Sequence, residues 1–391
     1  MIDVGKLYVG QPSPSERLRY RKAAGQAREA RPVVVWNTTR RCNLACVHCY
    51  SSSDASCCDD ELSGDEARQL IDDLARFGAP VLLLSGGEPL ARPDIVELAA
   101  YASEAGLRVA LSTNGTLIDE SCARRLRDAG VAYAGVSLDG LRETNDRFRG
   151  VEGAFDRALA GIRACRSVGL KVGLRYTMTG ANVDDIPGIL ELVREESIPR
   201  VCFYHLVYTG RGAGLTAQDL GPEQTRRVVN DIVDFAAEVH AAGEPREVLT
   251  VDNHADGPYI YLRMVREGHP GADRALELLR LNGGSSSGLG IGCVSWDGMV
   301  FPDQFWRNHP LGNVRERPFS EIWTDLSNPF LARLRNRREH IRGRCATCRF
   351  LDACGGNFRA RAEAVTGDPW ASDPACYLTD AEIGVPVEAE A

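Results

Sequence analysis

The chain has 391 residues, of which 44% are hydrophobic and 26% are charged, so it can form one large domain or two ordinary ones around a packed core. This composition excludes a mainly disordered chain, and no stretch approaches the roughly eighteen apolar residues that a membrane span needs. The first residues do not form a signal peptide, and the net charge of −8 argues against general nucleic-acid binding. We therefore expect a cytoplasmic protein that binds neither membranes nor nucleic acid.

The thirteen cysteines and the arginine excess are the two unusual features of the composition. In a reducing cytoplasm a disulfide framework is disfavoured, so metal binding is the leading interpretation of the cysteines. Only Lys6, Lys22 and Lys171 are lysines, and the remaining 43 of the 46 basic residues are arginines. There are two explanations for this arginine bias. One is codon usage, and the other is recognition of a carboxylate-rich ligand by bidentate guanidinium groups.

Strand-like and helix-like segments alternate along most of the chain. Residues 1–32 look like a short N-terminal lead-in. Short apolar runs rich in β-branched residues predict strands at 33–36, 81–84, 107–111, 131–138, 172–178 and 201–206. Between them, apolar residues at helical spacing predict helices, the clearest of which begins with a capping box at Ser63–Glu66. Further helices are expected near 94–105, 118–129, 154–168, 184–196 and 222–242.

Six strands that alternate with helices predict an α/β fold, a partial (β/α)6 barrel over residues 33–245, with its chemistry at the carboxyl ends of the strands. A doubly wound sheet is the alternative, but no glycine-rich dinucleotide motif follows the first strand. Residues 246–292 read as a connecting segment. Residues 293–391 are irregular and contain several cysteines, so they predict a small second domain held together by metal.

The first cysteine group, Cys42, Cys46 and Cys49, follows the first predicted strand with C-x3-C-x2-C spacing. A closed structural zinc site uses four ligands, and His48 could complete one. A cubane iron–sulfur cluster held by three thiolates instead leaves one iron open for another ligand. Three unrelated cysteines are the remaining alternative.

The ends of the next strands carry polar and glycine residues that would surround this loop. The second strand ends in Gly86-Gly87-Glu88, where glycines permit close backbone approach to a ligand and the carboxylate suits an ammonium group. The third ends in Ser112-Thr113-Asn114-Gly115, and the fourth ends in Ser137-Leu138-Asp139-Gly140. Each alone is an ordinary turn, but together at one edge they predict a binding site.

The cysteine loop, Gly-Gly-Glu-Pro and Ser-Thr-Asn-Gly together resemble the radical S-adenosylmethionine (radical SAM) superfamily. The resemblance implies that Cys42, Cys46 and Cys49 hold a [4Fe–4S] cluster whose open iron binds S-adenosylmethionine, and that a ferredoxin or flavodoxin supplies electrons. It also implies cofactor contacts by five residues: Gly86, Gly87, Glu88, Ser137 and Arg175. Which residue acts as a general acid or base is not readable from the sequence.

The second cysteine group is Cys345, Cys348, Cys354 and Cys376, with C-x2-C-x5-C-x21-C spacing. Four thiolates can close a structural zinc site, and the spacing also resembles the second auxiliary cluster of the SPASM extension of radical SAM enzymes. That extension has an earlier cysteine pair, but here Cys293 is followed by Asp303 at the second position. We therefore predict one auxiliary [4Fe–4S] cluster, with Asp303 as a poorer carboxylate ligand if a further one exists.

Three segments rich in His, Arg and aromatic residues, 202–212, 251–257 and 301–309, suit a large planar anionic ligand or an iron that needs an axial imidazole. Ordinary structural histidines are the alternative. The substrate-binding candidates are His205, Tyr208, Asn253, His254, Asp303, Trp306, Arg307 and His309.

With residues 6–10 and 367–380, these segments resemble the haem-biosynthesis branch of the superfamily, although Phe301 stands where we expect His. The resemblance implies removal of two acetate side chains from the iron porphyrinoid 12,18-didecarboxysiroheme, giving Fe-coproporphyrin III, with Arg side chains holding the carboxylates. One alternative is modification of the propionates of the same substrate toward the dioxo-haem of nitrite reductases. An alternative of another class is a non-catalytic iron–sulfur or porphyrin-binding protein.

Overall fold

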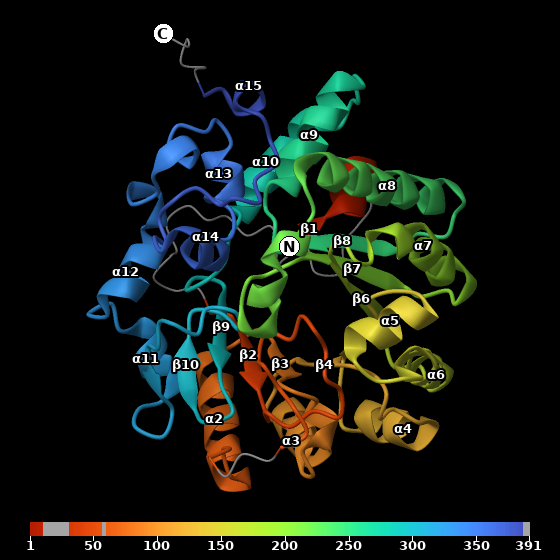
Figure 1. Cartoon of the computed structure of the whole chain (residues 1–391). Helices are drawn as coiled ribbons and strands as arrows, with labels where there is room; N and C mark the ends of the chain where they lie inside the picture. The colour runs from red at the N-terminus through yellow and green to blue at the C-terminus, as the bar shows by residue number, and fades with distance from the viewer. Residues whose placement is uncertain (11–30, 57–59, 386–391) are drawn as a thin grey trace.

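The computed structural model describes residues 1–10, 31–56 and 60–385 (Figure 1). Most of the predicted lead-in, the thiols of Cys57 and Cys58, and the last six residues lie outside these ranges. In the described residues, one curved sheet has the strand order β1-β8-β7-β6-β5-β4-β3-β2-β9-β10-β11. Its strands are β1 (Ile2–Asp3), β2 (Val33–Asn37), β3 (Leu82–Ser85), β4 (Val109–Thr113), β5 (Tyr133–Ser137), β6 (Val172–Met178), β7 (Arg200–His205), β8 (Glu247–Val251), β9 (Ile291–Val294), β10 (Met299–Phe301) and β11 (Gly312–Asn313).

Strands β2 to β8 run parallel to one another, so their carboxyl ends meet along one rim. Helices between these strands cover the convex face of the sheet (Figure 1). The apolar residues of both layers form a continuous core. The helices of the first part are α2 (Gly64–Phe77), α3 (Ile95–Glu104), α4 (Glu120–Asp128), α5 (Arg142–Arg149), α6 (Ala154–Ser167), α7 (Ile186–Glu195) and α8 (Pro222–Ala241). The predicted partial barrel is confirmed.

Helix α2 shows how the local sequence sets these boundaries. The Ser63 hydroxyl accepts from the backbone N–H of Glu66, and the Glu66 carboxylate accepts from the N–H of Ser63, which satisfies two otherwise free donors at the start of the helix. Gly78 ends the helix in a left-handed conformation. The predicted capping box is therefore present.

Elements at both ends extend the barrel beyond the predicted limits, and one helix within those limits was not predicted. Strand β1 pairs antiparallel with β8, so the first residues of the chain close the far edge of the sheet. Residues 246–292, expected as a connecting segment, contain β8 and the helices α9 (Asp256–Arg266) and α10 (Ala272–Asn282). Helix α5 was not predicted, because its sequence RETNDRFR is polar around most of its circumference.

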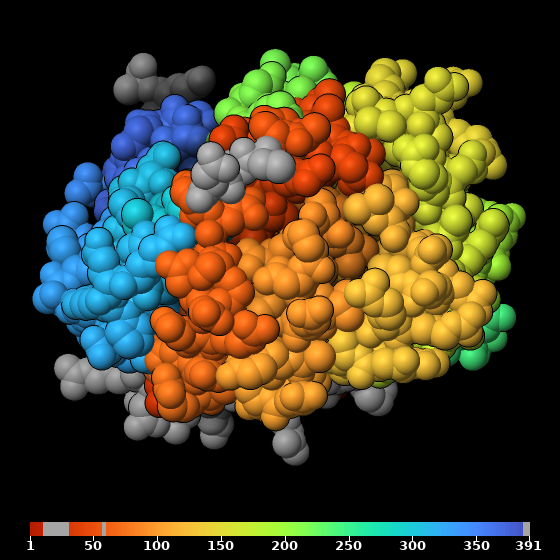
Figure 2. Space-filling view, turned by 90° about the horizontal axis from the view of Figure 1, so that it is seen from below, coloured from red at the N-terminus to blue at the C-terminus, as the bar shows by residue number. Residues whose placement is uncertain are grey.

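The C-terminal part packs against strand β2 and helix α2. Strand β9 pairs in parallel with β2, and β10 and β11 continue the sheet antiparallel. Ser320 donates to the carboxylate of Asp73 on α2, and Arg315 pairs with Glu66. Figure 2 shows these cyan and blue residues side by side with the orange residues of the barrel. The helices of the C-terminal part are α11 (Phe319–Thr324), α12 (Pro329–Arg335), α13 (Leu351–Cys354), α14 (Arg359–Thr366) and α15 (Asp380–Ile383). Within the described ranges, no helix has the length and apolarity needed to span a membrane.

Candidate active site and auxiliary metal centre

The first cysteine loop leaves the carboxyl end of β2 and is held in place by backbone hydrogen bonds. The N–H of Cys42 donates to the carbonyl of Asp54 at 2.6 Å, and the N–H of Ala45 donates to the carbonyl of Arg149 at 3.1 Å. The guanidinium of Arg211 donates to the carbonyls of Cys46 and Ser53. Cys42 and Cys46 are buried and Cys49 is half-buried, so these hydrogen bonds hold a loop whose three cysteines lie at the rim of the sheet.

The two glycines after β3 are required by the cysteine loop itself. A Cβ on Gly87 would lie 2.3 Å from the carbonyl oxygen of Arg41, and one on Gly86 would lie 2.5 Å from that of Thr39. The N–H of Gly87 also donates to the Thr39 carbonyl at 2.7 Å. Side chains at either position would push the cysteine loop away from the rim. Close backbone approach was predicted for a ligand, and the structure shows a second reason for it.

Glu88 joins the ends of two strands. Its carboxylate accepts hydrogen bonds from the hydroxyl of Thr113 and the N–H of Asn114, both at 2.7 Å, and from the N–H of Leu90 at 3.1 Å. The side chain is fully buried, and burial raises its pKa to about 6 against the lowering effect of these bonds. In this arrangement Glu88 fixes the end of β4 beside the cysteines, and its contact with a cofactor amine remains a prediction.

A buried charged network lies against Cys46. Arg149 at the end of α5 donates to the Cys46 sulfur at 3.5 Å and forms an ion pair with Asp139. Asp139 also lies 3.4 Å from Nε2 of His48, whose ring stacks on Phe148. Burial lowers the pKa of His48 to about 4, so its imidazole is neutral at pH 7. The network places one cation next to a thiolate of the first cysteine group, which fits an anionic metal cluster there.

Replacing Arg149 with glutamine should make a cluster held by Cys46 harder to reduce. Reduction adds negative charge, and a nearby cation stabilises the reduced form more than the oxidised form. We expect the midpoint potential to fall by about 60 mV or more, a tenfold change in the one-electron equilibrium. Redox titration followed by electron paramagnetic resonance measures this shift. Arg147→Gln, on the same helix, is the control, and an equal shift in both variants would contradict the assignment.

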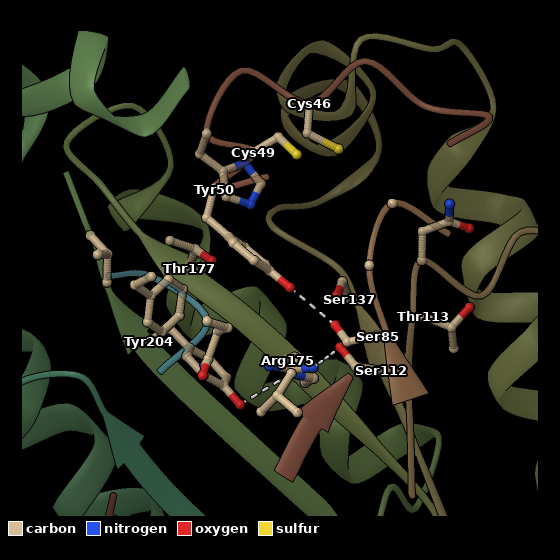
Figure 3. Close-up of a pocket in the computed structure, with 18 of the residues that line it drawn as sticks. Cys46, Cys49, Tyr50, Ser85, Ser112, Thr113, Ser137, Arg175, Thr177 and Tyr204 are labelled. Carbon is tan, nitrogen blue, oxygen red and sulfur yellow. Dashed lines mark hydrogen bonds between the residues drawn. The ribbon is translucent and has the colours of Figure 1, made fainter. Parts of the chain in front are cut away.

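A pocket opens at the carboxyl ends of the parallel strands, between the cysteine loop at the top of Figure 3 and the side chains of Arg175 and Tyr204 below it. It encloses about 1030 Å³ of space, counted to its open mouth. Arg175 on β6 crosses its floor, where its guanidinium donates to the hydroxyl of Tyr204 at 3.0 Å and to that of Ser112. Tyr50 points down to Ser85, 3.1 Å away. The polar floor thus faces the cysteines across an open space.

The structure brings most predicted cofactor residues to this pocket. The three cysteines, Gly86, Gly87, Ser137 and Arg175 line it. Several other lining residues were not singled out, although five of them lie within the segments 202–212, 251–257 and 301–309 that were predicted to suit a planar ligand. The residues not singled out include Tyr50, Ser85, Thr177, Tyr204, Val207, Asp252, Gln304 and Phe305.

Of the eight substrate candidates, only His205 lines this pocket in the part of the chain that the structure describes. Its Nε2 lies 2.9 Å from the buried carboxylate of Asp256. The other seven have structural contacts. Tyr208 donates to Asp219, Asn253 donates to the carbonyl of Ala375, and the backbone N–H of His254 donates to Asn357. Asp303 accepts hydrogen bonds from the backbone N–H groups of Phe305 and Trp306. The side chains of Trp306 and His309 contact Glu363, and the guanidinium of Arg307 lies over the ring of Trp296. Their direct contact with a substrate remains a prediction.

The second cysteine group is brought together by the C-terminal part of the chain. Burial raises the pKa of the Cys354 thiol well above its ordinary value, and the neighbouring thiolates of Cys376, Cys345 and Cys348 raise it further. The four sulfurs are thus within electrostatic reach of one another. Among the described residues, no three His, Cys, Asp or Glu side chains converge closely enough for a single metal ion.

Two buried arginines beside this group have no carboxylate contact within the described ranges. Arg359 donates to the carbonyls of Gly356, Pro369 and Ala371, and Arg337 donates to those of Gly283 and Gly355. Nε of Arg359 and one Nη of Arg337 are buried without a hydrogen-bond partner. Burial lowers the pKa of Arg337 to about 10. Buried cations need a compensating charge, and a four-thiolate metal centre supplies a negative one, so the residues fit such a centre.

Comparison with known proteins identifies the class. Residues 36–193 match the Radical SAM superfamily, and residues 290–349 match SPASM, an iron–sulfur cluster-binding domain. The chain belongs to the radical SAM superfamily and carries a SPASM domain. Membership assigns it a [4Fe–4S] cluster with S-adenosylmethionine and an auxiliary iron–sulfur cluster, as predicted.

Full-length relatives define the branch. Fe-coproporphyrin III synthase of Methanosarcina barkeri is 55% identical, and the match covers 98% of this chain and 99% of that protein. Pre-heme d1 synthase of Dinoroseobacter shibae is 44% identical, with 90% and 88% covered. AdoMet-dependent heme synthase of Methanosarcina barkeri is 36% identical, with 88% and 95% covered. The chain is therefore a radical SAM enzyme of the haem-biosynthesis branch, as the sequence resemblance implied.

Solved structures agree with the fold. The structure of anSMEcpe with bound AdoMet and a peptide aligns with a TM-score of 0.66 at 20% identity, covering 88% of this chain and 94% of that one. Streptococcus suis SuiB bound to its precursor peptide aligns with a TM-score of 0.70 at 18% identity, covering 90% and 76%. At these identities the likeness supports the partial barrel with its C-terminal extension and says nothing of the substrate.

Proposed function

We propose that this enzyme removes two acetate side chains from 12,18-didecarboxysiroheme to give Fe-coproporphyrin III. The observation that carries the proposal is the 55% identity to Fe-coproporphyrin III synthase over nearly the whole length of both chains. The lining of one pocket by the first cysteine group together with Gly86 and Gly87 also supports the proposal.

The pocket suits the two ligands that this reaction brings together. When bound, the cluster on Cys42, Cys46 and Cys49 and S-adenosylmethionine supply a 5′-deoxyadenosyl radical, which abstracts a hydrogen atom from the substrate. Gly86 and Gly87 present backbone beside the cysteines, and the guanidinium of Arg175 has N–H groups left for a carboxylate beyond its bonds to Tyr204 and Ser112. The aromatic rings of Tyr204 and Phe305 line the same space, where a planar macrocycle can stack on them.

The partners and location follow from this function. We propose that a small electron-transfer protein such as a ferredoxin or flavodoxin reduces the cluster, and that the enzyme works in the cytoplasm on an iron porphyrinoid, without nucleic acid or membrane. The second candidate function is propionate modification of the same substrate toward the dioxo-haem of nitrite reductases. The 44% identity to pre-heme d1 synthase favours it over any unrelated chemistry.

The test is an anaerobic incubation of the reconstituted enzyme with S-adenosylmethionine, a reductant and didecarboxysiroheme. We expect 5′-deoxyadenosine to form in a substrate-dependent way and free acetate to be released. Oxidised propionate side chains without acetate release would favour the second candidate. If no porphyrinoid stimulates 5′-deoxyadenosine formation, the protein is a non-catalytic iron–sulfur or porphyrin-binding protein and the proposal fails.

A further inference from the structure

Two acceptor atoms in the pocket have no partner. Oδ2 of Asp252 and Oε1 of Gln304 are inaccessible to solvent, and within the described residues neither accepts a hydrogen bond. Both residues line the pocket. Buried polar groups in folded proteins almost always have partners, so an unsatisfied pair facing one cavity indicates a ligand that satisfies it. Neither residue has a role in the site described above.

The backbone holds the Asp252 side chain in a fixed direction. Asp252 directly follows β8 and has a φ of 65°, a left-handed conformation that a residue with a side chain adopts rarely. Its carbonyl accepts from Arg361 at 3.0 Å, and the next two residues, Asn253 and His254, are hydrogen-bonded to the C-terminal part. Strain of this kind persists where the surroundings enforce it, often at functional sites.

The titratable groups that face Asp252 come from five parts of the fold. Burial raises the pKa of its carboxyl to about 6. The facing groups are the amino terminus at Met1 and the side chains of Arg361 on α14, Asp303 after β10, Arg175 on β6 and Tyr204 on β7. The cations lower this pKa, and Asp303 raises it. The pocket is therefore one in which a carboxylic acid can remain protonated close to neutral pH.

We infer that Asp252, in its protonated form, and the amide of Gln304 together bind one carboxylate of the macrocyclic substrate. This inference rests on the proposed function and names the residues that recognise the substrate. The acid O–H of Asp252 donates to one oxygen of the substrate carboxylate. The amide of Gln304, turned so that its NH2 group faces the pocket, donates to the other. The substrate anion itself favours the protonated acid, so binding takes up one proton.

The pair complements the cations of the site. Arg175 is hydrogen-bonded to Tyr204 and Ser112 at the floor of the pocket. Asp252 instead follows β8, and Gln304 lies in the segment after β10. Carboxylates at different edges of one macrocycle can thus be bound at different points, one by a guanidinium and one by neutral donors. Such an arrangement fixes which edge of the macrocycle faces the cysteines.

The test is an absorbance titration of the reconstituted holoprotein with didecarboxysiroheme, without reductant, between about pH 5.5 and 8.5. For the wild type we expect the Kd to rise about tenfold per pH unit above the pKa of the acid in the free enzyme and up to its higher pKa in the complex, because binding takes up one proton in this range. Asp252→Asn keeps a neutral donor and tolerates the left-handed backbone, so its Kd should stay within about threefold of the best wild-type value and lose the pH slope. Asp252→Leu and Gln304→Leu should each weaken binding at least about tenfold at pH 6.

Three results would overturn the inference: wild-type affinity in Asp252→Leu, an unchanged pH slope in Asp252→Asn, or weakened S-adenosylmethionine binding in place of weakened macrocycle binding. Iron content and the unfolding midpoint show that each variant is folded and loaded. If the wild type binds the macrocycle but releases no acetate, the proposed function fails, and the inference is still judged by the Kd values. A wild type that binds no macrocycle contradicts both.

Discussion

Cys46→Ala is expected to abolish 5′-deoxyadenosine formation completely and to lower bound iron from about eight to about four atoms per chain. The buried Cys46 sulfur is one of the three thiolates assigned to this cluster, so two of the three remain, too few to hold a cubane cluster that already leaves one iron open. Iron analysis and quantification of 5′-deoxyadenosine after anaerobic reconstitution measure both effects. The auxiliary cluster should survive, because its cysteines belong to a separate part of the chain.

The control for this variant is Cys122→Ala on α4. Cys122 is half-buried and packs against the hydrophobic core. Its substitution therefore removes one thiol from the same chain without changing either cysteine group. It should keep about eight irons and wild-type 5′-deoxyadenosine formation. A Cys46→Ala protein that retains all its iron or cleaves S-adenosylmethionine at the wild-type rate would refute the assignment of this loop.

The second large effect concerns stability. Arg361 and Asp373 form an ion pair at 2.9 Å whose side chains are both completely buried. Arg361 also donates to the carbonyls of Leu206 and Asp252, so the pair connects the C-terminal part to the ends of β7 and β8. Asp373→Asn leaves a buried cation without its counter-charge, which typically costs about 3–5 kcal/mol. We expect the thermal unfolding midpoint to fall by roughly 5–10 °C.

Asp352→Asn is the matched control, because Asp352 forms a 2.8 Å ion pair with Arg338 whose two side chains are 64% and 50% exposed. An exposed pair of this kind contributes at most about 1 kcal/mol, so its midpoint should move little. Calorimetry of the reconstituted proteins compares the two. Equal shifts for both variants would show that the buried pair does not stabilise the contact between the two parts.

The repeating strands and helices were predictable because buried parallel strands leave continuous apolar runs, as in 33–36, and covering helices leave a 3.6-residue period. Helix α5 was missed because it carries few apolar residues and is held by contacts such as that of Arg149 with Asp139. The pairing of β1 with β8 joins residues nearly 250 positions apart, and two-residue strands have no pattern to detect.

The site was predictable where its chemistry is written as a motif. Cysteine spacing and adjacent glycines have few structural alternatives, so Cys42 and Gly86 were found. Asp252, Gln304 and Tyr204 lie in the three predicted segments but were not singled out, because only the curved sheet shows which residues of those segments face one pocket. His309 was a plausible ligand by residue type, but its Nε2 lies 2.8 Å from Glu363. His254 was another, but its backbone N–H donates to Asn357 and the residue lines no part of the described pocket.

The most direct test of the proposed function is mass spectrometry of the porphyrinoid product after anaerobic turnover with didecarboxysiroheme. The account predicts a product that has lost both acetate side chains and kept all of its propionates unmodified, with the mass and absorbance spectrum of Fe-coproporphyrin III, and two acetates released per macrocycle. A product that keeps its acetate groups and carries altered propionates would contradict it.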